Sequence, residues 1–135
     1  MRRSGPGLAV AVASLALAAP AAATTYRGAG TGDPQMRVRL QLAADGTVAF
    51  EYAKVLVECT NDERLREPGA EHLASLNELG RFGDTVSEEV GDGTASSSVK
   101  GRVGARKARG TVSFDLTYAG GECHSGSVPW KARRK

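Results

Sequence analysis

The sequence predicts an all-β fold, an antiparallel β-sandwich or small barrel of about seven or eight strands with one disulfide. Apolar and polar residues alternate with a period of two along most of the chain, as in strands that bury one face. Glycine-containing turn sequences separate these segments about every 8–14 residues. No segment shows a convincing helical period, so the strands account for the whole domain.

Residues 1–23 have the composition of a secretory signal peptide, which leaves residues 24–135 as a single secreted β domain. Arg2 and Arg3 precede an apolar run, 8–19, that is shorter than the roughly 20 residues of a membrane span. Alanines follow at the positions where signal peptidase requires small side chains. We therefore expect an extracellular location and no membrane span.

The first half of the domain predicts two strands and a loop. Residues 35–42 alternate apolar and polar side chains, and Asp45-Gly46 then favours a tight hairpin turn. The returning strand, 47–59, changes its apolar parity near Ala53, which predicts a β-bulge or bend. Residues 60–70 are polar and include a Pro-Gly pair, so a loop is expected there.

Residues 71–79 fit two patterns. A strand would place Leu73, Ser75, Asn77 and Leu79 on one face, whereas a helical turn would group His72, Leu76 and Leu79. The strand is favoured because the flanking segments are strand-like, including the next one at 81–90.

The second half predicts three more strands. Residues 94–103 and 111–118 are joined by a glycine-rich hairpin tip, 104–110, and 111–118 shows the clearest alternation in the chain. The last strand is 123–132. Proline cannot donate to a ladder, so Pro129 predicts that this strand lies at an edge or bulges.

Cys59 and Cys123 are the only cysteines, and an isolated pair in an exported protein predicts a disulfide. Closing so long a loop would stabilise the fold by about 4 kcal/mol. The alternative is a metal site built from the two cysteines with His72 and His124. It is disfavoured because structural zinc sites use more regularly spaced ligand pairs. We expect no metal and no cofactor.

Charge is distributed unevenly along the chain. Residues 51–92 hold 11 acidic and 4 basic residues, a balance of −7, whereas residues 100–135 hold 9 basic and 2 acidic residues, a balance of +7. The two halves either neutralise each other within the fold or present opposite faces. A candidate cationic patch consists of Arg106, Lys107, Arg109, Lys131, Arg133, Arg134 and Lys135. Nucleic acid is not the expected ligand, because stacking aromatics are nearly absent around these residues.

Groups for catalysis are present but poorly arranged. A nucleophilic triad could draw on His72 or His124 with Asp115 or Glu122, but no Gly-x-Ser-x-Gly elbow is present. Ser125 and Ser127 beside His124 are more simply turn residues. Carboxylates for glycoside hydrolysis could come from Glu51, Glu58, Glu88 or Asp115. Trp130 could stack on a sugar, although a place in the core is the more ordinary role for a single tryptophan.

The second half of the chain also carries a resemblance. Its motifs are Arg81-Phe82-Gly83, Val99-Lys100-Gly101, Ala108 to Phe114 (ARGTVSF) and Cys123 to Trp130 (CHSGSVPW). Over roughly residues 80–133 the chain resembles small exported β-proteins of high-GC actinobacteria. The resemblance implies a bacterial, exported β fold and carries over no catalytic residue. Exported protease inhibitors and enediyne-binding β-sandwiches of these bacteria are similar in size but normally carry two disulfides.

These features favour a secreted, non-catalytic binding or cell-envelope-associated module, not an enzyme. An anionic cell-envelope polymer or a secreted protein are the partners considered. The first alternative is a secreted inhibitor or effector that docks on another protein through residues 60–70, and the second is a small hydrolase.

Overall fold

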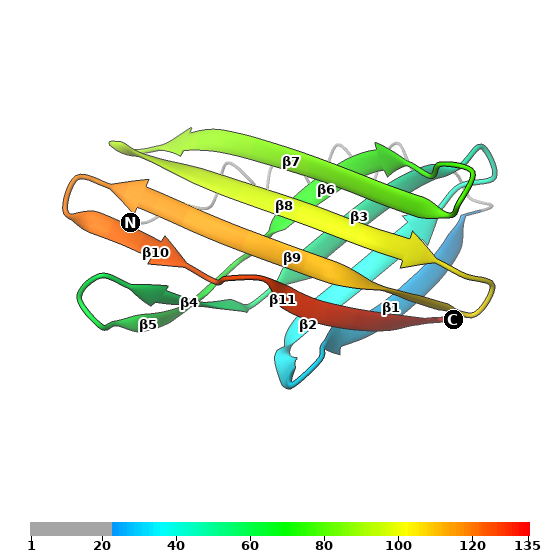
Figure 1. The fold of residues 1–135 in the computed structure, drawn as a ribbon, viewed down its shortest axis with the longest axis horizontal. Coiled ribbons are helices and arrows are strands. Elements are labelled where there is room, and N and C mark those ends of the chain that lie inside the picture. The colour runs from blue at the N-terminus through cyan, green and yellow to red at the C-terminus, as the bar shows by residue number, and fades with distance from the viewer. Residues whose placement is uncertain (1–22) are drawn as a thin grey trace.

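The computed structural model describes residues 23–135, and these form eleven β-strands and no helix (Figure 1). The strands are β1 (Thr24–Gly30), β2 (Asp33–Leu42), β3 (Thr47–Ala53), β4 (Val55–Cys59), β5 (Arg64–Glu67), β6 (Ala70–Ser75), β7 (Arg81–Val90), β8 (Gly93–Val103), β9 (Lys107–Tyr118), β10 (Gly121–His124) and β11 (Val128–Arg134). The predicted signal peptide, apart from Ala23, lies outside the described residues. Within them, no helix could cross a membrane.

All strand pairs are antiparallel, and the strands form one curled sheet, a half-barrel, which confirms the predicted fold class. The order along the sheet is β5-β4-β10-β9-β11-β1-β2-β3-β6, and β8 pairs with the other edge of β9 and carries β7. In Figure 1, β7, β8 and β9 run across the front, and β1, β2, β3 and β6 cross behind them. The apolar faces of both groups of strands point into the space between them.

Several elements differ from the sequence-based expectation. The strand expected at 47–59 is divided at Lys54, whose φ is 63°, and this break is where the predicted change of parity occurs. The strand expected at 123–132 is likewise divided between β10 and β11. The segment 60–70 is not a plain loop, because β5 returns along β4 as a hairpin. The structure also adds β1, which the sequence analysis did not anticipate.

Two further expectations hold only in part. Residues 71–79 do begin as a strand, but its inward face holds Ala70, His72 and Ala74, and Leu73 is 45% exposed. Pro129 does not mark an edge strand, because β11 lies between β9 and β1. Pro129 is not required to donate a hydrogen bond to β1, because the ladder between β11 and β1 ends at Trp130, opposite Gly30.

An aromatic cluster ties the two groups of strands together. The ring centroid of Trp130 on β11 lies 4.8 Å from that of Phe50 on β3 and 6.4 Å from that of Phe82 on β7. A Cβ atom at Gly101 or Gly110 would lie 2.9 or 2.8 Å from the indole, so these glycines make room for it. Trp130 is 1% exposed, which excludes the sugar-stacking role.

The predicted disulfide is present and joins Cys59 at the end of β4 to Cys123 on β10. The two residues lie directly opposite each other in the ladder. Both thiols are oxidised, so the alternative metal site that used them is excluded.

Candidate functional site

Basic side chains from six strands line up on the outer face of the curled sheet. In one row, Arg81, Arg102, Arg109 and Lys131 are successive cross-strand neighbours, and the row continues past Ala29 to Arg37. In the parallel row, the successive neighbours are Lys107, Arg133, Arg27 and Arg39. We call this set, together with Lys100, the basic band: Arg27, Arg37, Arg39, Arg81, Lys100, Arg102, Lys107, Arg109, Lys131 and Arg133. Every member is exposed.

The band is not neutralised by the fold. Like charges directly opposite one another on a sheet face are destabilising, each pair by up to about 1 kcal/mol. Among residues 23–135, Arg39 is the one member with a carboxylate at ion-pair distance, 3.4 Å from Glu51. The remaining arginine–carboxylate pairs of the described residues are Arg64–Glu58 and Arg66–Asp33, and both arginines lie on β5, outside the band. None of the ion pairs among the described residues joins the acidic segment 51–92 to the basic segment 100–135.

The predicted cationic patch contributes part of this band. Lys107 and Arg109 lie within β9, not at a hairpin tip, and face Arg133 and Lys131 on β11. The other three members lie beside the band, near the turn before β9. The backbone amide of Arg134 donates to the Arg106 carbonyl, and that of Lys135 donates to the Thr25 carbonyl.

The patch predicted from the sequence did not include the six band members on other strands: Arg27, Arg37, Arg39, Arg81, Lys100 and Arg102. The signal that could have found them is their position on the polar side of alternating strands. They lie beside the predicted patch only because of the strand order, which places Arg27 near the start of the domain opposite Arg133 near its end.

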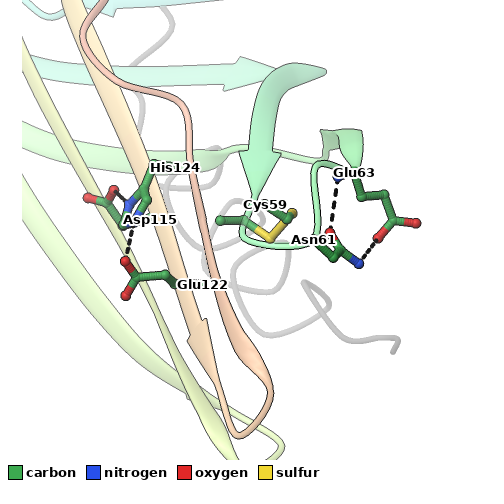
Figure 2. The surroundings of a disulfide bond; sticks show 7 residues. Cys59, Asn61, Glu63, Asp115, Glu122 and His124 are labelled. Atoms are coloured by element: carbon green, nitrogen blue, oxygen red, sulfur yellow. Dashed lines mark hydrogen bonds and ion pairs between the residues drawn. A yellow bond between two sulfur atoms is a disulfide. The ribbon is translucent and has the colours of Figure 1, made fainter.

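The opposite end of the sheet is acidic and contains the second histidine (Figure 2). His124 on β10 lies 2.6 Å from Asp115 through Nδ1 and 2.9 Å from Glu122 through Nε2. Hydrogen bonds to Glu122 and then Asp115 raise the pKa of His124 above its usual value of 6.5. The imidazolium donates to both carboxylates, so neither ring nitrogen faces a serine.

Ser125 is not part of a catalytic arrangement with His124. Its hydroxyl donates to the Gly126 carbonyl and accepts from the Phe114 amide. It thus closes the turn between β10 and β11, as the sequence suggested. Residues 23–135 also contain no cluster of histidine, cysteine and carboxylate groups that could hold a metal ion.

The other histidine belongs to a buried chain of hydrogen bonds with the connectivity of a triad. His72 Nε2 lies 2.8 Å from Ser97 Oγ, and His72 Nδ1 lies 2.8 Å from Asp84 Oδ2. Tyr52 hydrogen-bonds Ser97 in turn. Ser97 is only 1% exposed, and Tyr52 occupies the remaining side of its hydroxyl, so a substrate carbonyl has no approach to it.

The candidate carboxylates for glycoside hydrolysis are dispersed. Glu58 pairs with Arg64 and lies opposite His124 at the acidic end. Glu88 lies on β7, and Asp115 is bound to His124. Glu51 instead faces Glu71, a buried carboxyl group that the sequence analysis did not single out.

The hairpin β4–β5, expected to be a docking loop, is anchored to its surroundings. Arg66 donates to Asp33 and to the Lys54 carbonyl, both at 2.8 Å, and the hydrogen bond lowers the pKa of Asp33. Docking of another protein on this hairpin stays a hypothesis.

The candidate site is therefore the basic band, whose charges come from strands distant in sequence. No known protein family, curated protein or solved structure shows a significant match to this chain.

Proposed function

We propose that this is an exported, non-catalytic binding protein that holds an anionic polymer of the cell envelope against the basic band. The observation that carries the proposal is the register of the band. It sets cations opposite cations across β7, β8, β9, β11, β1 and β2. Such an arrangement costs stability in the free protein, and a polyanion would relieve the repulsion.

The extent of the band favours a polymer over a small anion. Neighbouring strands lie about 4.8 Å apart, so six strands present cations over roughly 24 Å of curved surface. A single phosphate would contact only two or three of these side chains. A chain of regularly spaced phosphates or carboxylates could follow a whole row.

The composition of the band disfavours single-stranded nucleic acid. Recognition of unpaired bases normally uses exposed aromatic side chains as stacking platforms. Trp130 is buried, and Tyr118, 36% exposed, lies at the other end of β9 from the band. A polymer whose backbone carries the charge and whose units need no stacking fits better.

Binding of a poly(glycerol phosphate) oligomer at several salt concentrations tests the proposal. We expect the affinity to fall by about a thousandfold between 50 and 200 mM salt if six or more phosphates are engaged. Replacing Arg102, Arg109 and Arg133 with glutamine should weaken binding at least tenfold. The matched control is Arg64→Gln, which removes an arginine from β5, outside the band.

Three results would count against this function. They are no measurable binding at 50 mM salt, equal loss with the control variant, or tighter binding of single-stranded DNA than of the phosphate polymer.

A further inference from the structure

A pocket lies where the basic band meets two carboxyl groups. Along the second row of the band, Arg39 is followed by Glu51 on β3 and then by Glu71 on β6. A cavity of about 300 Å³ opens over these residues, with Arg37 at one side and Pro68-Gly69 at the other. The pocket thus carries guanidinium groups at its β2 side and a carboxyl group at its β6 side.

Glu71, which lines this pocket, is unusual for a carboxylic side chain because it is buried and incompletely hydrogen-bonded. Its side chain is only 5% exposed, and Oε1 has no hydrogen-bond donor among the described residues. Burial, and then the neighbouring Glu51, raise the pKa of Glu71 to about 8. Glu51 already accepts from Arg39, so Glu71 is the carboxyl group of this pair that holds a proton at neutral pH.

Resting on the proposed function, we propose that this pocket binds an ammonium group carried by the anionic polymer. Once the Glu71 carboxyl group turns toward the pocket, an ammonium group can supply the donors that Oε1 lacks, and its charge replaces the proton on Glu71. Arg37 has no carboxylate partner among residues 23–135 and is free to hold the adjacent phosphate. Cationic and anionic groups of one ligand would thus be held across β2, β3 and β6.

Binding of the ammonium group should release a proton. Glu71 passes from the carboxylic acid to the carboxylate, its proton goes to the buffer, and no covalent bond is made or broken. The charged groups that face Glu71 in the pocket are Glu51 on β3 and Arg37 and Arg39 on β2; Pro68 and Gly69 contribute none. Arg39 is already paired with Glu51. The charge of an ionised Glu71 would therefore be balanced by the ammonium group of the ligand.

Two oligomers separate this inference from simple charge attraction. One is a glycerol-phosphate oligomer with 2-aminoethyl ether side groups, and the other is the same oligomer after N-acetylation. The acetylated form is the more negative, so the basic band alone would bind it more tightly. An ammonium pocket predicts the reverse, with the aminated form bound at least fivefold more tightly.

Glu71→Gln should abolish this preference while both oligomers still bind, and the exposed control Glu89→Gln should keep it. Titration calorimetry of the unaltered protein in two buffers of different ionisation enthalpy supplies a test that needs no variant. About one proton should be released per bound aminated oligomer at pH 7, and none with the acetylated form.

The outcomes distinguish the two proposals. If neither oligomer binds, the proposed function fails and the pocket fails with it. If both bind but the acetylated oligomer binds more tightly, or no proton is released, the ammonium pocket alone is wrong. Loss of the preference in Glu89→Gln as well would place the ammonium group elsewhere.

Discussion

His72 on β6 lies 2.8 Å from Asp84 on β7 through Nδ1, and this contact joins two strands that share no backbone ladder. Burial lowers the pKa of His72 below its usual value of 6.5, although Asp84 opposes the shift. The neutral ring then donates from Nδ1 to Asp84 and accepts at Nε2 from Ser97, whose oxygen accepts from Tyr52. Each hydroxyl or ring N–H thus donates to the next group in the order Tyr52, Ser97, His72, Asp84. This single chain of hydrogen bonds gives partners to four side chains, from β3, β8, β6 and β7.

Asp84→Ala should destabilise the protein by about 2 kcal/mol, because the buried Nδ1–H of His72 loses its acceptor. Urea denaturation at pH 7 measures the free energy of unfolding. The matched control is Asp115→Ala, which removes the acceptor of Nδ1 in the exposed His124 and should cost much less, because solvent replaces the lost partner. Equal losses in the two variants would show that the contact between β6 and β7 contributes nothing particular.

The two histidines should titrate on opposite sides of pH 6.5. For His72 the folded pKa is lowered, so its contribution to stability is complete above pH 6.5 and is lost as the pH falls through the folded value. For His124 the folded pKa is raised, so its contribution is present below pH 6.5 and is lost as the pH rises through the folded value. NMR titration of the ring protons gives both pKa values directly, and the reverse order would contradict the assigned network.

The sequence predicts local structure here better than it predicts the surface. Asp45-Gly46 forms the expected turn because Gly46 adopts a φ of 89° and the Asp45 carboxylate accepts from the Thr47 amide. The disulfide follows from composition alone. By contrast, β1 has a single large apolar residue, Tyr26, so its sequence shows little alternation. It is a strand because it pairs with β2 on one side and β11 on the other.

The candidate site could be predicted only in part for the same reason. A run of basic residues near the C-terminus is visible in the sequence, but its continuation depends on register between distant strands. Arg102 faces both Arg81 and Arg109 only because β8 lies between β7 and β9. The burial of Glu71 and its position opposite Glu51 depend likewise on the pairing of β3 with β6.

Glu71→Gln should stabilise the free protein at neutral and alkaline pH. The folded pKa of about 8 exceeds the ordinary value of 4.5, so the folded protein holds a proton that the unfolded chain has released. Stability associated with this group therefore falls as the pH rises from 4.5 to 8. The variant should gain about 2 kcal/mol at pH 8 and little at pH 4.5, measured by urea denaturation. Glu89→Gln should show no such pH-dependent gain, and a parallel gain there would refute the assignment.

Removing the disulfide should lower the stability by about 4 kcal/mol in the chain-entropy model. The double variant Cys59→Ala, Cys123→Ala tests this by urea denaturation, with the reduced native chain as a second form. Hydrogen exchange should also rise most in β4, β5 and β10, because the ladder between β10 and β4 has only two residue pairs. An unchanged unfolding midpoint in both forms would contradict the prediction.

Arg102→Gln should leave the stability unchanged or raise it by about 0.2–1 kcal/mol, because Arg102 lies between two other arginines. Arg66→Gln should lower stability, since Arg66 donates to Asp33 and to the Lys54 carbonyl. Thermal unfolding at low and high salt measures both effects, and any gain in Arg102→Gln should shrink as salt screens the band. A residue whose removal stabilises the protein but weakens polymer binding is kept for the ligand and not for the fold. If Arg102→Gln destabilised the protein as much as Arg66→Gln, the band would be structural, and the main argument for a polyanion ligand would be lost.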